Sequence, residues 1–324
     1  MSLYLGDMSA WEYLSLHEGE WGLRGEASTY MGDFRSSAPG KFEVEDARRG
    51  ALSGLASPVH LLVGSRRVRR MLPETRLHLW TQDVPRRGFY RAGHTRDIYV
   101  STPEFAYVQM AHGCDVIQLI ARGFEACGTY YVTDRDARGF RKRDALTKPS
   151  LIRRLLNSPV GYRGARKVGR SLRYVLPGAA SPMETVLTML LCLPCLLGGY
   201  GLPQPQLNHA IAIPFAQRAR FTQARFVCDL YWGKARLDVE YDSTMFHAGA
   251  DEIVRDSKRR DALALLGISV ITVTAGQLYD VRELDKVARL VAKRLGRRIC
   301  TVRTRDWERR RDALRRQLLP GGRS

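Results

Sequence analysis

Two short runs around a glycine turn constrain the fold of this chain more than any other feature. Residues 226–232 and 236–242 alternate between apolar and polar side chains, which predicts two adjacent β-strands. In the second run Asp238, Glu240 and Asp242 share one predicted face. A solvated strand also carries acids, but three in a row on a half-buried sheet repel one another. A divalent cation is the simplest counter-ion, so this face is a candidate metal site.

The first run adds another acid close to this face. Strict alternation along the strand predicts that Val227, Asp229 and Tyr231 point to the same side. Because the turn between the runs is short, the two strands are expected to pair with each other. Asp229 is therefore expected near the acids of the second strand.

The flanking segments predict an α/β domain with a mixed sheet. Gly267 ends a helical pattern, and the β-branched run Ile268–Thr274 after it predicts a strand. The expected elements are helix 182–197, strands 206–213, 226–232 and 236–242, helix 251–266, strand 268–274 and helix 280–296. The order from 182 to 274 is thus α-β-β-β-α-β. The N-terminal half, with β-rich runs from Pro58 and helices after Ser101, is expected to be α+β.

The length of 324 residues allows two domains, each with its own core. Pro177–Pro182, rich in proline, glycine and alanine, is the clearest break between them. The predicted segments are an N-terminal segment at 1–55, a basic α+β domain at 56–178, the α/β domain at 179–298 and a basic tail at 299–324.

The charge of the chain predicts an acidic partner. Lys and Arg number 52 against 33 Asp and Glu, a formal net charge of +19, and arginines crowd the C-terminal segment. Basic side chains bind phosphates with release of counterions, so nucleic acid is the expected partner. A basic surface also suits a membrane face or a ribosomal contact.

The N-terminus and the longest apolar stretch predict a cytoplasmic protein that does not enter a membrane. Met1–Met8 has neither a basic region nor an apolar core typical of a secretory signal. The stretch 186–197 is too short to cross a bilayer and is broken by Pro194. The six cysteines show no regular framework, which fits a reducing compartment.

The order of the elements and several short motifs resemble the nuclease core of the PD-(D/E)XK superfamily. More specifically, they resemble the small domain related to very-short-patch-repair endonucleases, often found in actinobacterial proteins behind an antitoxin-like region of the abortive-infection type. The motifs are Ser181-Pro-Met-Glu184, Gly201-Leu-Pro-Gln-Pro-Gln206, Cys228-Asp229, Leu237-Asp-Val-Glu-Tyr-Asp-Ser243 with His247, Arg255-Asp256 with Arg259 or Arg260, and Leu263-Ala-Leu-Leu-Gly267. The resemblance covers 181–280 well and 58–178 more loosely, through residues 99–111 and 163–166.

The resemblance implies a metal site for phosphodiester hydrolysis. Asp229 and Glu240 are its expected ligands, and hard carboxylate oxygens suit Mg²⁺ or Mn²⁺. Glu184 is implied as a third carboxylate or a water-binding group. It also completes an S-x-x-E capping box with Ser181 at a helix start, and both interpretations stand.

The sequence departs from the family pattern at Asp242, where the third motif usually carries lysine. Related small domains commonly have Asp there and a downstream His, so His247 is implied as a general base or leaving-group acid. Structural alternatives remain for both, since Asp242 can hydrogen-bond the turn at Ser243-Thr244 and a lone histidine is often structural.

A replacement for the missing lysine is expected on the helix that follows. Arg255, Lys258 and Arg259 are candidates for binding the scissile phosphate, although such a basic helix face is usually only solvated. Gln206 resembles a polar position of the family and is a further candidate substrate-binding residue.

The predicted function is a metal-dependent endonuclease acting on DNA in defence, in a toxin–antitoxin pair or in repair. One alternative is a non-catalytic, antitoxin-like DNA-binding regulator with a degenerate nuclease fold, which the missing lysine favours. Another is an RNA-directed nuclease toxin, which the same chemistry allows. Cleavage of both strands would favour a homodimer, and the antitoxin-like region at 56–178 could bind a regulatory protein partner.

Overall fold

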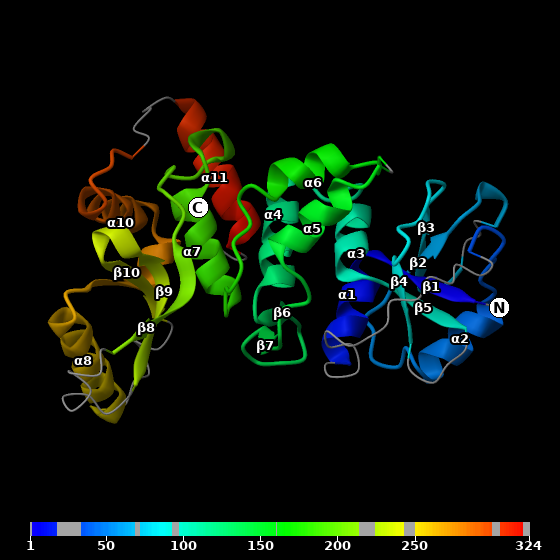
Figure 1. The fold of residues 1–324 in the computed structure, drawn as a ribbon, viewed down its shortest axis with the longest axis horizontal. Helices are drawn as coiled ribbons and strands as arrows, with labels where there is room; N and C mark the ends of the chain where they lie inside the picture. The colour runs from blue at the N-terminus through cyan, green and yellow to red at the C-terminus, as the bar shows by residue number, and fades with distance from the viewer. Residues whose placement is uncertain are drawn as a thin grey trace. The chain divides into compact units, whose positions relative to one another are not determined.

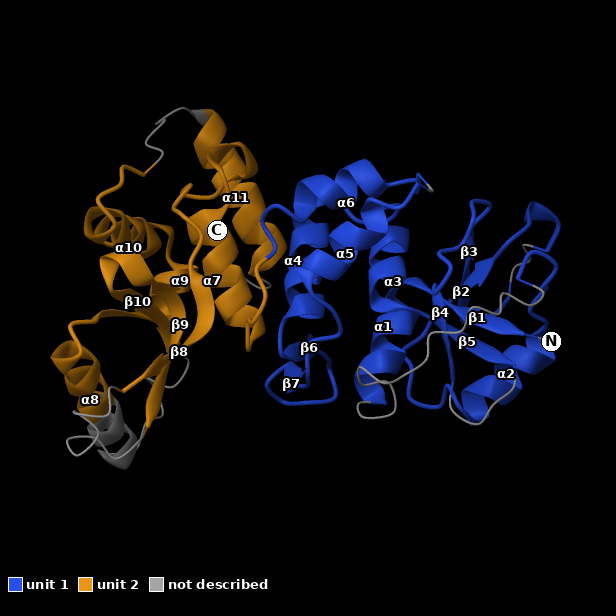
Figure 2. Cartoon of the chain, in the orientation of Figure 1, with its two compact units in different colours: residues 1–175 blue, residues 176–324 orange. Residues whose placement is uncertain are grey.

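The structure, a computed structural model, describes residues 2–17, 34–68, 72–92, 97–159, 161–213, 224–242, 250–299 and 305–319. The side chains of residues 250–256 and of Arg305 lie outside the description. The chain divides into unit 1, residues 1–175, and unit 2, residues 176–324 (Figure 2). The division falls just before the predicted break at Pro177–Pro182.

Unit 1 is built on a five-stranded sheet in the order β3-β2-β1-β5-β4. The strand pairs β2–β3 and β1–β5 are parallel, and β1–β2 and β4–β5 are antiparallel. The strands are β1 (Leu3–Leu5), β2 (Val59–Val63), β3 (Thr75–Leu79), β4 (Phe89–Arg91) and β5 (Ile98–Ser101). The helices are α1 (Asp7–Leu16), α2 (Lys41–Arg49), α3 (Pro103–Met110), α4 (Val116–Cys127), α5 (Pro149–Leu156) and α6 (Ala165–Ser171), and a small hairpin pairs β6 (Tyr130–Val132) with β7 (Phe140–Lys142).

The N-terminal segment is part of this unit, which differs from the predicted boundary at residues 55 and 56. Strand β1 lies between β2 and β5 and is buried along its whole length. Its apolar side chains complete a core that the later strands cannot close alone, because β1 occupies the middle of the sheet. Residues 1–55 therefore do not form a separate segment in the described structure.

Unit 2 confirms the α/β class and has a mixed four-stranded sheet in the order β11-β10-β9-β8 (Figure 1). Strand β10 pairs antiparallel with β9 and parallel with β11, and β8 pairs antiparallel with β9. The elements are α7 (Pro182–Cys192), β8 (Gln206–Ala212), β9 (Arg225–Trp232), β10 (Leu237–Asp242), α8 (Ala250–Leu265), β11 (Ser269–Thr274), α9 (Ala275–Tyr279), α10 (Val281–Arg294) and α11 (Arg305–Leu318).

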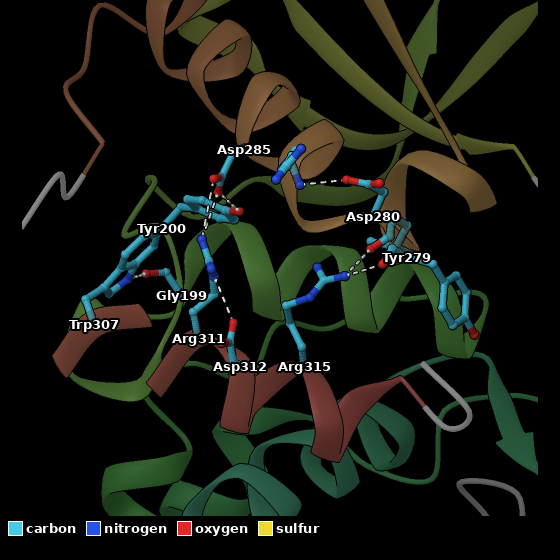
Figure 3. A network of polar contacts seen from close by, with 11 residues as sticks. Gly199, Tyr200, Tyr279, Asp280, Asp285, Trp307, Arg311, Asp312 and Arg315 are labelled. Atoms are coloured by element: carbon cyan, nitrogen blue, oxygen red, sulfur yellow. Dashed lines mark hydrogen bonds and ion pairs between the residues drawn. The ribbon is translucent and has the colours of Figure 1, made fainter. Parts of the chain in front are cut away.

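The segment predicted as a basic C-terminal tail instead contributes a helix to unit 2. Helix α11 is held by a network of polar contacts (Figure 3). Trp307 donates a hydrogen bond of 3.1 Å to the carbonyl of Gly199 and packs edge-on against Tyr200. Arg315, 7% exposed, donates hydrogen bonds to the carbonyls of Leu278 and Tyr279. The arginines of this segment are thus partly structural.

The close approach of α11 also requires a glycine. Gly198 has a φ angle of 91°, and a Cβ atom on it would lie 2.3 Å from the carbonyl oxygen of Arg310 in α11. Gly201 has a similar φ of 71, but its added Cβ would meet only the Sγ atom of Cys195, at 3.7 Å. Comparing the two positions therefore distinguishes the cost of a left-handed backbone, which both share, from the cost of a steric clash with α11, which only Gly198 would suffer.

We expect Gly198→Ala to destabilise unit 2 by about 2 kcal/mol more than Gly201→Ala. Both substitutions force alanine into the left-handed region, at about 1–2 kcal/mol each, but only the first also drives a methyl group into α11. Urea unfolding of both variants measures the difference. Equal losses would contradict the close packing of α11 on this turn.

The cysteines differ from the expectation of a fully reduced chain. Cys114, Cys127, Cys192 and Cys228 are free thiols, whereas Cys195 is disulfide-bonded. In the part of the chain that the structure describes, no helix has the length and apolar character needed to span a bilayer.

Candidate active site of unit 2

The regular alternation of β9 is interrupted at Asp229. Cys228 and Tyr231 belong to the same buried cluster, although their odd spacing would place them on opposite faces of a regular strand. His209 of β8, which pairs with Cys228, also stacks on the ring of Tyr231. The predicted common face of Val227, Asp229 and Tyr231 is therefore wrong.

Asn208 marks the irregularity on the neighbouring strand. Leu207 pairs with Leu230 and His209 with Cys228, and between them Asn208 has φ 46, in the left-handed region that asparagine tolerates best after glycine. Its side-chain amide donates hydrogen bonds to the carbonyl of Gly178 and to Glu184 Oε2, at 3.0 and 2.6 Å. Asn208 thus orients a predicted site residue, a role that sequence reasoning missed.

Glu184 acts as a helix-capping residue at the start of α7. Its backbone N–H donates to Ser181 Oγ, whose hydroxyl donates to Glu184 Oε1, and Glu184 Oε2 accepts from the N–H of Ala180. Ser181 is thus the N-cap of α7, as the capping interpretation predicted, but the carboxylate of Glu184 accepts from the N–H of Ala180, one residue before the N-cap. Because Glu184 is only 8% exposed, its charge also acts on the groups around it.

Asp229 is an ionisable group with a strongly perturbed affinity for protons. Burial, together with the negative charges of Glu184 and Glu240, raises the pKa of Asp229 to about 7. The N–H of Tyr241 donates a hydrogen bond of 3.2 Å to Asp229 Oδ2 and opposes this shift, as does the charge of Arg259. Asp229 therefore lies close enough to Glu184 and Glu240 for the charges of both to act on it.

Glu240 forms an ion pair with Arg259 of α8. One guanidinium nitrogen of Arg259 bonds Glu240 Oε1, and another donates to the carbonyl of Val227 in β9. The side chains of Glu240 and Arg259 are 16% and 29% exposed, so water screens the pair only in part. Of the two candidates on this helix whose side chains the structure describes, Lys258 and Arg259, it is Arg259 that contacts a predicted ligand.

Asp238 is the most deeply buried acid of the group and was not chosen as a site residue from the sequence. It is 0% exposed, and neither carboxylate oxygen accepts a hydrogen bond from a described residue. Burial and the charge of Glu240 raise the pKa of Asp238 to about 8. The signal was present, since Asp238 begins the alternating row of acids, but the sequence did not show its burial.

We expect Asp238→Asn to stabilise the chelator-treated protein at pH 8. A carboxyl group whose pKa is raised on folding binds more protons in the folded than in the unfolded state, so stability falls as the pH rises from about 4 to about 8. The amide removes that charge and can donate to Glu240, which should add on the order of 2 kcal/mol at pH 8. Urea unfolding at pH 5 and pH 8 measures the change.

The control is Asp261→Asn, which changes an exposed acid of α8 in the same way. If the free energy of unfolding of Asp238→Asn depended on pH as strongly as that of the unmodified chain, the account would be contradicted.

Three of the remaining predicted residues lie on described elements of unit 2. Asp242, half-buried, ends β10 opposite Thr274 of β11. Gln206 and Lys258 are exposed on β8 and α8. His247 and the side chain of Arg255 lie outside the described residues.

The three predicted ligands are not gathered tightly enough to form a metal cage. Among the described residues, the group of three ligand atoms lying within 4.8 Å of one another consists of Asp7, His60 and His78 in unit 1, which could hold a metal ion. In unit 2 all three carboxylates already have protein partners. Glu184 accepts hydrogen bonds at the start of α7, Asp229 accepts one from the N–H of Tyr241, and Glu240 is paired with Arg259.

The chain is similar to two proteins of Mycobacterium tuberculosis. These are the uncharacterized protein MT2308 of strain CDC 1551 / Oshkosh and the uncharacterized protein Rv2248 of strain H37Rv, each 28% identical over 137 residues. The similarity covers 42% of this chain and 45% of each relative, so the matched region spans less than half of their length. No family model and no solved structure matches the chain.

Proposed function

We propose that unit 2 is a metal-dependent endonuclease that hydrolyses phosphodiester bonds in DNA. The observation that carries the proposal is the raised pKa of Asp229, about 7, in a group of acids with Glu184 and Glu240. The buried and unbonded carboxylate of Asp238 lies in the same group. A cluster of carboxyl groups on the two inner strands of the sheet, with pKa values raised by burial and by one another's charge, is typical of a site that receives a cation.

The donor atoms suit Mg²⁺ or Mn²⁺. All are carboxylate oxygens, the hard ligands that these ions prefer. Asp229 and Glu240 would hold the ion, with Glu184 as a third carboxylate or through a water molecule. When bound, the ion would polarise the phosphoryl group and lower the pKa of the attacking water.

Arg259 supplies the positive charge that the family pattern assigns to lysine. It bonds Glu240, so a cation at Glu240 would release the guanidinium. A released arginine can bind two phosphate oxygens at once, which suits the scissile group. Arg255, Lys258 and Gln206 are proposed to add substrate contacts, with His247 as acid or base and Asp242 beside it.

The net charge of +19 supports a nucleic acid as the substrate. DNA follows from the resemblance to repair endonucleases, and the same resemblance supports a cytoplasmic role in defence, in a toxin–antitoxin pair or in repair. A homodimer would allow both strands to be cut, and unit 1 would then be free to bind a regulatory protein.

The test is a cleavage assay with the purified full chain. Supercoiled plasmid, single-stranded DNA and single-stranded RNA are incubated at one salt concentration with Mg²⁺, with Mn²⁺ or with a chelator. We expect cutting of DNA with either metal and none with the chelator. Folded protein that binds DNA but cuts nothing would overturn the proposal.

A second candidate is the non-catalytic DNA-binding regulator. The ion pair between Arg259 and Glu240 favours it, because the pair neutralises a predicted ligand without a metal. Such a protein would bind DNA with salt-sensitive affinity that does not change on addition of chelator. Filter binding in both conditions separates the two functions.

A further inference from the structure

A second group of metal-ligating side chains lies in unit 1, apart from the acids of unit 2. Asp7 begins α1, His60 lies on β2 and His78 lies on β3. The parallel register pairs His60 with Arg76 and Leu62 with His78, so the two histidines are diagonal neighbours on one face of the sheet. Asp7 follows directly on β1, the next strand of the same sheet.

The ligand atoms of this Asp7–His60–His78 group all lie within 4.8 Å of one another, and His78 Nδ1 lies 4.0 Å from Asp7 Oδ2. His60 Nδ1 lies 3.1 Å from His78 Nε2 and 3.4 Å from Asp7 Oδ1. Ligands at zinc bond lengths in a tetrahedron lie about 3.4 Å apart. The group therefore needs only small side-chain movements to place an imidazole nitrogen from each histidine and a carboxylate oxygen around one centre.

The backbone of Asp7 is held in an unusual conformation by buried hydrogen bonds. Its φ is 51, in the left-handed region, and its N–H donates to Gln109 Oε1 at 2.8 Å. Gln109 in turn donates to Ser101 Oγ, which donates to the carbonyl of Leu5. Left-handed backbone held by its surroundings is a feature of functional sites, and here it sets the direction of the carboxylate.

The three side chains are shielded from solvent but remain within reach of it. Those of Asp7, His60 and His78 are 11%, 14% and 24% exposed. A cavity of about 350 Å³, lined among others by Ser9, Glu12 and His60, opens beside the group. Of the three ligands His60 lines this cavity, which gives an ion a route to the group.

We propose that Asp7, His60 and His78 bind a first-row transition metal ion of the Zn²⁺ type. Two imidazoles and one carboxylate are a common ligand set for such ions, whereas Mg²⁺ prefers oxygen ligands alone. The bound ion connects α1 with β2 and β3 and thereby stabilises unit 1. A fourth position stays open to water or to a small anionic ligand.

The same three residues also form a metal-free polar group, in which one nitrogen of His60, Nδ1, lies within hydrogen-bonding distance of both His78 Nε2 and Asp7 Oδ1. The two descriptions differ in their response to added metal. The test does not use the nuclease activity proposed for unit 2, so its outcome is independent of the proposed function.

The experiment is a titration of the chelator-treated, desalted full chain with Zn²⁺ and, separately, with Co²⁺. We expect a high-affinity Zn²⁺ site, an intense visible absorption of four-coordinate Co²⁺, and a higher melting temperature with Zn²⁺. His78→Gln should weaken this Zn²⁺ site by about 100-fold or more and remove both spectral and thermal effects. His17→Gln, a change of the same type at the end of α1, should leave them unaltered.

Two results would overturn the proposal. One is well-folded protein that binds no Zn²⁺, and the other is a Zn²⁺ site that His78→Gln leaves unchanged. If His78→Gln does not fold, Asp7→Asn serves in its place, because asparagine also tolerates the left-handed backbone at this position. Circular dichroism of each variant verifies the fold before titration.

Discussion

Glu240→Gln is expected to lower the rate of metal-dependent DNA cleavage by about a thousandfold or more. The substitution keeps the shape of the side chain but removes the charge that would hold the ion and that pairs with Arg259. Initial nicking rates of supercoiled plasmid in Mg²⁺, measured with excess enzyme, give the effect.

The control is Asp261→Asn, an acid-to-amide change on the exposed side of α8. It alters the net charge by the same amount, so DNA binding through the overall field changes equally in both variants. A Glu240→Gln protein as active as Asp261→Asn would exclude Glu240 from the chemistry.

Arg259→Ala is expected to reduce cleavage by about a hundredfold, and Arg259→Lys to restore part of that loss. Alanine removes the positive charge beside Glu240, whereas lysine supplies the ammonium group that the family pattern has at its third motif. Lysine cannot bond two oxygens in a plane, so the recovery is incomplete. Nicking rates of the two variants are compared with that of Arg49→Ala, which removes one positive charge at an exposed position of unit 1.

Faster cleavage by Arg259→Ala would assign Arg259 a different role. If Arg259→Ala cuts faster than the unmodified chain, the ion pair with Glu240 holds the site in an inactive state and does not stabilise the transition state. Equal rates in Arg259→Ala and Arg49→Ala would remove Arg259 from the site.

Most elements of unit 2 could be predicted because their signals are local. The alternation in residues 226–232 and 236–242 and the break at Gly267 depend on near neighbours in the sequence, and the strands end within a residue or two of the expected positions. The α/β class follows from their order. The helix expected at 182–197 ends earlier, at Cys192, because Pro194 cannot continue it.

Features that depend on distant residues were not predictable in this way. Strand β1 has three residues and no pattern of its own, yet it occupies the middle of the sheet of unit 1. The irregularity at Asp229 arises with Asn208 on another strand. In each case tertiary packing overrides the local pattern.

The candidate site shows the same division. Asp229 lies beside β10, as expected, because its carboxylate accepts a hydrogen bond from the N–H of Tyr241. The capping of α7 by Ser181 and Glu184 was visible as a local motif. The burial of Asp238, the bond from Asn208 to Glu184 and the partner of Glu240 depend on residues at least 19 positions away or on packing that a single sequence does not display. The histidines of the Asp7–His60–His78 group are separated from Asp7 by more than fifty positions in the sequence and gave no motif.

The central claim is that Asp229 and Glu240 hold a divalent cation, and Mn²⁺ binding measured by electron paramagnetic resonance tests it most directly. The measurement uses the full chain with His60→Gln, which removes the separate Asp7–His60–His78 group. The account predicts a bound Mn²⁺ ion that is lost when Asp229→Asn is added. Equal Mn²⁺ binding with and without Asp229→Asn would contradict it.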